Sequence, residues 1–195
     1  MSLREEILKV SRKLLLEDGF NKMSMRKIAK RADVSATSIY LHFRNKDDLL
    51  LALIEESIEH LNRVLRKAVD STRDPVEQLE DLARKYLNYA LRHPQAYEII
   101  YMVRPEEMPK YPKEKFQEVR SSYELIAGII QKGKEKKLFD VEDSLISAYT
   151  LWAQLHGIAA VILNKRLDTR IPVEEFTEQA IEHIIHGFVV QKTPV

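Results

Sequence analysis

A run of short polar, aromatic and basic side chains occupies residues 34–46, which read VSATSIYLHFRNK. Hydroxyls, a phenol, an imidazole and cations alternate there with Val34, Ile39, Leu41 and Phe43, which we expect to be buried. A helix that only packs has no need of so many donors and acceptors. Such groups are the ones that reach phosphates and base edges in DNA. The stretch is therefore a candidate nucleic-acid contact.

Positive charge gathers around the same stretch. The chain has a net charge of only +1, but residues 20–46 hold seven Lys or Arg against one Asp, a local charge of +6. Clustered cations bind polyanions and release their counterions. On charge alone, the alternative is a solvated helix face. The seven cations are Lys22, Arg26, Lys27, Lys30, Arg31, Arg44 and Lys46.

Composition excludes several other classes of protein. The 195 residues are 45 % apolar and include no Cys, which rules out disulfides and thiolate zinc sites. We expect no membrane-spanning run of about 18 apolar residues and no secretory signal, and therefore a soluble, cytoplasmic protein. No phosphate loop, metalloprotease motif or nucleophile–base pair is present, so neither an enzyme nor a cofactor is expected. His183 and His186 stand three apart, but without further ligands they predict no metal site.

Apolar spacing near 3.6 residues runs through almost the whole chain and predicts an all-α fold. Residues 104–113 contain three prolines and cannot form a regular helix. The expected helices span 3–18, 25–32, 36–42, 46–70, 76–92, 95–103, 114–137, 142–164 and 173–190.

The second and third of these helices have the spacing of a helix-turn-helix, whose second helix enters the DNA major groove. Ala29 supplies the small residue that the helix crossing needs, and Asp33 tolerates the left-handed turn between the helices. Apolar residues that tie both helices to the first one are Ile28, Ala32, Val34 and Ile39. The residues then left to point outward are Ala36, Thr37, Ser38, Tyr40 and His42.

The stretch from Ile7 to Leu53 resembles the DNA-binding domain of TetR-family transcriptional regulators, most specifically in its Y-x-H-F-x-N-K-x-x-L-L signature. Asp33 departs from the family pattern, which usually has Gly at that position. Ala36 also departs from it, since family members often carry Gly, Lys or Gln there. The resemblance implies DNA contacts, with Tyr40 and Lys46 as phosphate contacts. Met25 cannot hydrogen-bond a base through its side chain. The implied DNA-binding residues are Ser24, Met25, Arg26, Ser35, Thr37, Ser38, Tyr40, His42 and Lys46.

Aromatic residues are concentrated in the middle of the chain. Seven of the eight Tyr lie in residues 86–149, and Trp152 follows. Such residues can be core, or they can line a pocket between helices. The resemblance implies a pocket for a small-molecule effector, and its walls suggest an apolar or amphipathic one. The candidate lining residues are Tyr86, Tyr89, Met102, Tyr123, Trp152 and His156, the last of which could instead serve an interface.

The last two expected helices show more apolar surface than one contact needs. Small residues on 142–164 would let a second helix pair approach, and isoleucines on 173–190 add a broad face. A homodimer through these helices follows, as the family implies. The residues concerned are Ala148, Ala153, Gly157, Ala159, Ala160, Ile181, Ile184, Ile185 and Phe188.

These observations predict two domains and a regulatory function. Residues 1–46 would form the helix-turn-helix DNA-binding domain, and residues 47–195 a larger helical ligand-binding and dimerisation domain. The hypothesis is a ligand-responsive transcriptional repressor on a palindromic, double-stranded DNA operator. Two alternatives remain, a sequence-independent architectural DNA-binding protein and a helical enzyme or carrier that retains a DNA-binding unit.

Overall fold

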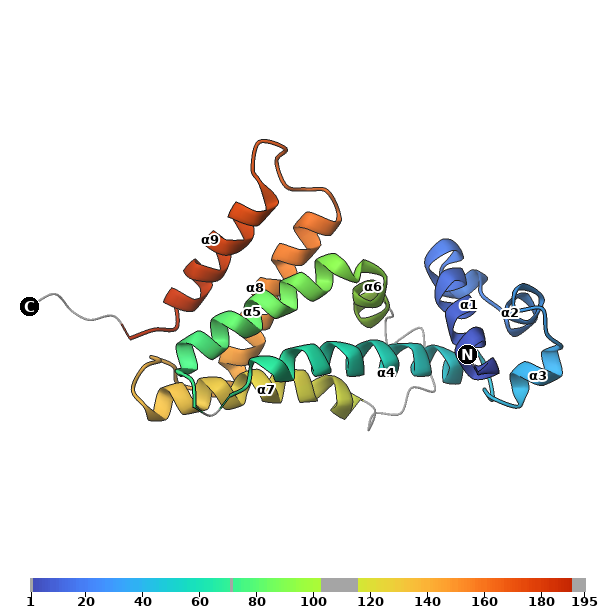
Figure 1. Ribbon diagram of the computed structural model, residues 1–195, viewed down its shortest axis with the longest axis horizontal. Helices are drawn as coiled ribbons and strands as arrows, with labels where there is room; N and C mark the ends of the chain where they lie inside the picture. Colours follow the sequence, from blue (N-terminus) through green and yellow to red (C-terminus); the bar gives the residue numbers. More distant parts are fainter. Residues whose placement is uncertain (1, 71, 103–115, 191–195) are drawn as a thin grey trace, which may run out of the picture. The chain divides into compact units, whose positions relative to one another are not determined.

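The computed structural model describes residues 2–70, 72–102 and 116–190 and is helical, without a β-strand in those ranges. The all-α prediction is confirmed (Figure 1). The α-helices are α1 (Leu3–Asp18), α2 (Met25–Arg31), α3 (Ala36–Tyr40), α4 (Lys46–Leu65), α5 (Pro75–Arg92), α6 (Pro94–Met102), α7 (Phe116–Glu135), α8 (Ser144–Leu163) and α9 (Val173–His186). Two 3₁₀ turns, η1 (Phe20–Lys22) and η2 (Arg66–Ala68), were not predicted.

Side-chain caps explain why the helix starts could be read from the sequence. Ser2 and Glu5 form a capping box at α1, and Asp74 caps α5 immediately before Pro75. Asp143 accepts from two amides at the start of α8, which begins at Ser144 and not at the predicted residue 142. The helix ends were predicted less accurately. The fourth helix was expected to reach residue 70, but α4 ends at Leu65 and the chain continues as η2. The proline-rich stretch 104–113 lies outside the described residues.

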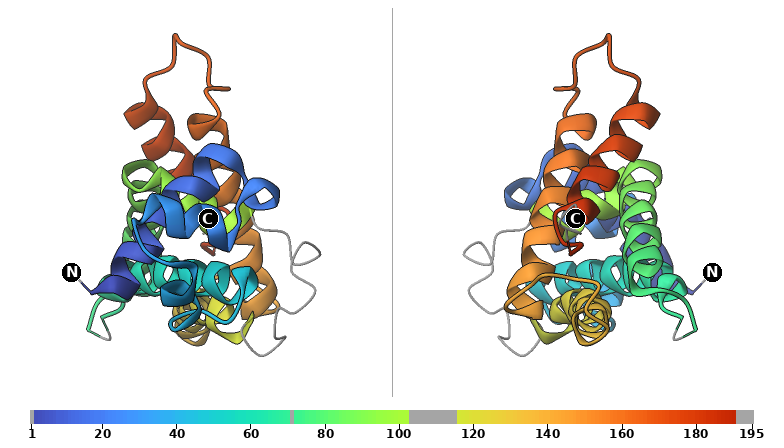
Figure 2. Two further views of the ribbon diagram at one scale, coloured as in Figure 1. Left: turned by 90° about the vertical axis from the view of Figure 1, so that its right-hand side faces the viewer. Right: turned by 90° about the vertical axis from the view of Figure 1, so that its left-hand side faces the viewer.

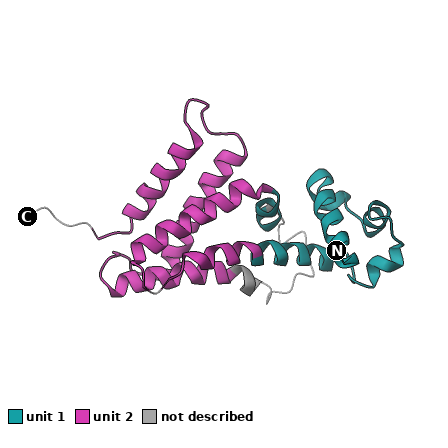
Figure 3. Ribbon diagram, viewed as in Figure 1, with its two compact units in different colours: residues 1–59, 95–115 teal, residues 60–94, 116–195 magenta. Residues whose placement is uncertain are grey.

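The chain divides into two compact units, residues 1–59 with 95–115 and residues 60–94 with 116–195 (Figure 3). The division falls inside α4, and the predicted boundary after residue 46 lies within the first unit. In the first unit, Ile7, Ile28 and Leu53 are fully buried. Burial of each such side chain contributes about 1.5–3 kcal/mol.

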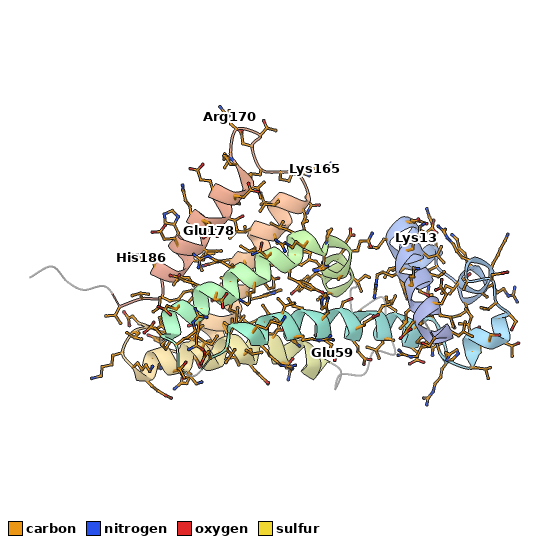
Figure 4. All side chains as sticks on the ribbon, viewed as in Figure 1. Lys13, Glu59, Lys165, Arg170, Glu178 and His186 are labelled. Atoms are coloured by element: carbon orange, nitrogen blue, oxygen red, sulfur yellow. The ribbon has the colours of Figure 1, made fainter. Side chains whose placement is uncertain are left out.

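In the second unit, α5, α7, α8 and α9 pack on one another, and α5 contacts each of the other three. Figure 2 shows these helices from two further sides. Arg84 of α5 donates to Glu178 of α9 at 2.9 Å, and Figure 4 labels that glutamate. The pair links α5 to the last described helix of the unit. The fully buried core of the second unit includes Leu79, Leu82, Ile130, Leu151, Leu155 and Ile181.

Helix α8 corrects the expectation that no apolar run approaches membrane-spanning length. By length and composition it is the one described helix that could cross a membrane. Core helices of soluble proteins meet the same criteria, and α8 packs against α5, α7 and α9. Only 28 % of its most apolar stretch is buried, however, so much apolar surface of this helix remains uncovered.

A short antiparallel bridge attaches the end of the described chain to the loop after α7. The amide of Asp140 donates to the carbonyl of Phe188, and the amide of Val190 donates to that of Leu138, both at 2.9 Å. The Phe139 ring is buried directly against Gly133 of α7, where a Cβ atom would overlap the ring. Glycine at position 133 is therefore a packing requirement.

Replacing Gly133 with Ala is expected to lower the free energy of unfolding by about 1–3 kcal/mol, because the methyl group overpacks the Phe139 site. The matched control is Gly128→Ala on the same helix, where a Cβ atom meets nothing within 4 Å. That change is expected to raise stability by about 0.5–1 kcal/mol through helix propensity. Urea unfolding at one protein concentration measures both. Equal effects of the two substitutions would contradict this account of Gly133.

Candidate DNA interface and effector site

The helix-turn-helix is built by two capped helices and one left-handed residue. Ser24 accepts from the amide of Lys27 at the start of α2, and Ser35 accepts from the amide of Ser38 at the start of α3. Asp33 has φ 54°, so the predicted left-handed turn is confirmed. These three positions set where α3 begins and how the chain enters it.

Burial of Ile39 and Phe43 decides which side of α3 reaches solvent. The two side chains are 0 % and 3 % exposed. Tyr40 is 54 % exposed. Of the predicted DNA-binding residues, Ser24, Arg26, Ser35, Thr37, Tyr40 and His42 are exposed, and Ser38 and Lys46 are half-buried. The arrangement presents hydroxyls, a phenol and an imidazole on one surface, all of which can hydrogen-bond phosphates or bases.

Three residues differ from what the sequence suggested, and the smallest difference is at Val34, which was expected to be buried and is half-buried. Met25 is only 7 % exposed, so its side chain belongs to the core and only its main chain could contact DNA. Leu41 was expected to be buried but is 80 % exposed, because α3 ends at Tyr40 and the chain turns there. Between Tyr40 and His42, Leu41 offers an apolar surface suited to a thymine methyl group or a sugar. Helical periodicity could not identify it, since that period no longer applies past the helix end.

The seven cations of residues 20–46 fall into three groups, which differ in the partners of their side chains. Lys27 pairs with Asp18 at 2.7 Å and Arg31 pairs with Glu17 at 2.8 Å. The Lys27 hydrogen bond holds the pKa of the Asp18 carboxyl below its usual value. The Lys46 ammonium donates to the carbonyl of Phe20. Within the described residues, no side-chain hydrogen bond or ion pair is found for Lys22, Arg26, Lys30 or Arg44.

The candidate effector residues of α7 and α8 form one aromatic cluster. The Tyr123 ring lies edge-on to Trp152 at 5.2 Å, and Trp152 stacks on His156, also at 5.2 Å. Tyr149, which was not among the candidates, stacks on Tyr123 at 4.3 Å. Burial lowers the pKa of the His156 imidazole. A neutral imidazole stacked on Trp152 favours apolar or weakly polar groups over anions.

A second cluster surrounds Tyr89, which is 3 % exposed. Its ring lies 5.3 Å from His60 and 5.1 Å from His93, and the two imidazoles are 5.1 Å apart. Sequence reasoning missed both histidines, since they are 33 positions apart and meet only because α4 and the end of α5 converge. Tyr86 is buried, with 2 % exposure. The side chain of Met102 lies outside the described residues.

Comparison with known proteins agrees with this geometry. Residues 7–53 match the family model "Bacterial regulatory proteins, tetR family", and residues 79–184 match "Tetracyclin repressor-like, C-terminal domain". The second match covers more than half of the chain.

Relatives and a solved structure extend the likeness. The chain is 33 % identical to an uncharacterised HTH-type transcriptional regulator of Haemophilus influenzae over 47 % of this chain and 49 % of that protein. It is 26 % identical to the HTH-type transcriptional repressor KstR2 of Mycobacterium tuberculosis over 79 % and 80 %. A Rhodococcus sp. RHA1 protein of unknown function superposes with a TM-score of 0.82 at 26 % identity, over 97 % of both chains.

Because some cations of residues 20–46 are paired with carboxylates and others are not, we expect substitutions of Arg26 and Arg31 to change DNA binding unequally. Arg26→Gln is expected to reduce the slope of log affinity against log salt by about 0.9, because one phosphate contact is lost. Arg31→Gln is expected to change the slope much less, since Glu17 already balances that charge. Fluorescence anisotropy with a labelled duplex between about 50 and 200 mM salt measures both. The same slope change for the two variants would mean that the pairing does not govern the interface.

Proposed function

The chain belongs to the TetR family of bacterial regulatory proteins, and on this basis we propose that it is a ligand-responsive repressor that binds a palindromic operator as a homodimer. As a family member it is a DNA-binding transcriptional regulator and not an enzyme. The observation that carries the proposal is the exposed polar surface of α3, held outward by the buried Ile39. The name of the M. tuberculosis relative supports repression. The protein would act on DNA in the cytoplasm.

The proposed dimer would form through α8 and α9, and the burial pattern leaves Ala153, Gly157, Ala160 and Ile184 of the expected residues accessible to a partner. Ala148, Ala159, Ile181, Ile185 and Phe188 are buried within the protomer and are not available to a partner. On α8, the residues of one helix face remain exposed and form a stripe. They are Ile146, Thr150, Ala153 and Gly157, which are four, three and four positions apart. On α9, the partly exposed apolar residues are Val173, Phe176, Ala180 and Ile184.

The exposed stripe on α8 suits a close helix–helix contact. Ile146 is 68 % exposed and, with Leu145 at 49 % and Tyr149 at 40 %, forms a group of neighbouring exposed apolar residues, which is typical of an interaction site. At Gly157, a Cβ atom would meet nothing within 4 Å in the protomer, so no contact inside the chain requires glycine there. A second α8 approaching at this point would explain a glycine that otherwise costs about 1 kcal/mol against Ala. Two recognition helices related by a two-fold axis would then read inverted half-sites.

The proposed response to a ligand is a shift between two conformations. Helix α4 follows directly from the helix-turn-helix and continues into the second unit, where His60 joins the Tyr89 cluster. A ligand that prefers one position of α4 would change the separation of the two recognition helices in the dimer. Moving the equilibrium from mostly bound to mostly released needs about 5.5 kcal/mol of differential affinity.

Selection of genomic fragments on the purified protein, followed by sequencing, tests operator binding. We expect a single motif with two inverted halves. Gly157→Leu is expected to give a folded monomer that no longer enriches the motif, because the side chain blocks the partner helix. Gly128→Leu, the same change at an equally open position on α7, is the control and should remain dimeric by light scattering. Motif-free recovery of DNA would instead favour the architectural DNA-binding protein.

The chain has a single Trp, so the fluorescence of Trp152 reports on the aromatic cluster directly. An apolar effector is expected to change this emission and to release labelled DNA over the same concentration range. Suitable probes are a long-chain alkyl carboxylate and a planar polycyclic alcohol. Tyr123→Leu should weaken the response about three- to tenfold through loss of the ring contacts. Lys165→Ala, in the loop between α8 and α9 (Figure 4), is the control. DNA release without any change in Trp152 emission would place the effector elsewhere.

A further inference from the structure

The side chain of Lys46, the first residue of α4, is held in place by Phe20 of η1. Its ammonium lies 3.8 Å from the centroid of the Phe20 ring and donates to the Phe20 carbonyl at 3.0 Å. Both residues belong to the first unit. The cation is thus fixed by one hydrogen bond and one cation–π contact.

The partners of Lys46 differ in kind from those of its neighbours. Lys27 and Arg31 pair with carboxylates, which cancel their charge. The partners identified for Lys46 are an aromatic face and a carbonyl oxygen, which orient the ammonium but leave its charge uncompensated. Because both partners are neutral, the positive charge of Lys46 remains available to an anion outside the protein.

The position of Lys46 is unfavourable for the helix that it begins. The N-terminus of a helix carries the positive end of the macrodipole, so a cation there is disfavoured while carboxylates such as Asp47 and Asp48 are favoured. An anion bound at this point would interact well with both the ammonium and the helix end. A DNA phosphate is the anion that the neighbouring α3 surface brings close.

The turn before η1 places Phe20 under the lysine. Gly19 ends α1 with φ 76° and ψ 164°, a conformation that is essentially restricted to glycine. The Phe20 ring is half-buried and is not part of the fully buried core. Replacement of this ring should therefore affect the Lys46 side chain more than the fold.

We propose that Phe20 is a positioning residue for DNA binding, whose ring and carbonyl hold the Lys46 ammonium in the conformation that contacts a backbone phosphate. The inference rests on the proposed contact of Lys46 with DNA. An ammonium has three donors, and the Phe20 carbonyl takes one, which leaves two for phosphate oxygens. A lysine side chain loses much rotamer freedom when it is immobilised, and here the loss occurs on folding and not on binding.

A double-mutant cycle tests this role. The variants are Phe20→Leu, which keeps the carbonyl but removes the ring, Lys46→Gln, and the combination of both. The probe is a labelled random-sequence duplex, titrated by anisotropy at several salt concentrations. Phe20→Leu is expected to weaken binding about three- to fivefold with an unchanged salt slope, since the phosphate contact still forms. Lys46→Gln should reduce the slope by about 0.9. In the Lys46→Gln background, removal of the ring should have almost no further effect.

Three outcomes would overturn the proposal. An equal loss from Phe20→Leu in both backgrounds would show that the ring acts independently of Lys46. An unchanged affinity in the Phe20→Leu variant would show that the ring has no role. An unchanged salt slope in the Lys46→Gln variant would remove the phosphate contact itself.

Controls separate this result from loss of structure and from failure of the proposed function. Lys13→Gln on α1 (Figure 4) removes a cation that lies outside the cation cluster of residues 20–46 and should leave the slope unchanged. Thermal unfolding of Phe20→Leu shows whether the unit remains folded. Because the duplex has no operator, failure to find an operator motif would refute the specific repressor and leave the cycle interpretable.

Discussion

Burial of Ile39 is the interaction on which the DNA-binding surface depends. A helix of five residues such as α3 cannot form by itself, because helix nucleation is unfavourable and only a few hydrogen bonds repay it. The side chain of Ile39, at 0 % exposure, fixes both the existence of the helix and its rotation. At 100° per residue, Thr37 then points almost directly away from the core. Tyr40 is brought to the surface by the same rotation.

Electrostatics in the first unit divides between folding and recognition. Glu17 and Asp18, at the end of α1, pair with Arg31 and Lys27 of α2. These exposed pairs add little stability, but they orient α2 and reduce repulsion within a crowded set of cations. The remaining positive charge is therefore carried by fewer residues than the sequence implies, and each of them has a clearer role towards phosphate.

Different faces of helix α8 have different roles in the second unit. Leu151 and Leu155 pack into the core, Trp152 and His156 belong to the aromatic cluster, and Gly157 remains exposed. If a ligand contacts the cluster and a partner covers the exposed stripe, both act on one rigid element. A ligand-dependent change could then reach the dimer contact without a long pathway through the protein.

The sequence by itself determined the helices, their caps and the left-handed turn at Asp33, since these depend on neighbouring residues and on a period of 3.6. It also identified the outward face of α3 through residue types. Only the tertiary structure decided the exposure of Leu41, the burial of Met25 and the meeting of His60 with His93. These features depend on where a helix ends and on which distant segment packs beside it. Local propensity does not fix the last residue of a helix, and spacing contains no information about contacts between residues far apart in the chain.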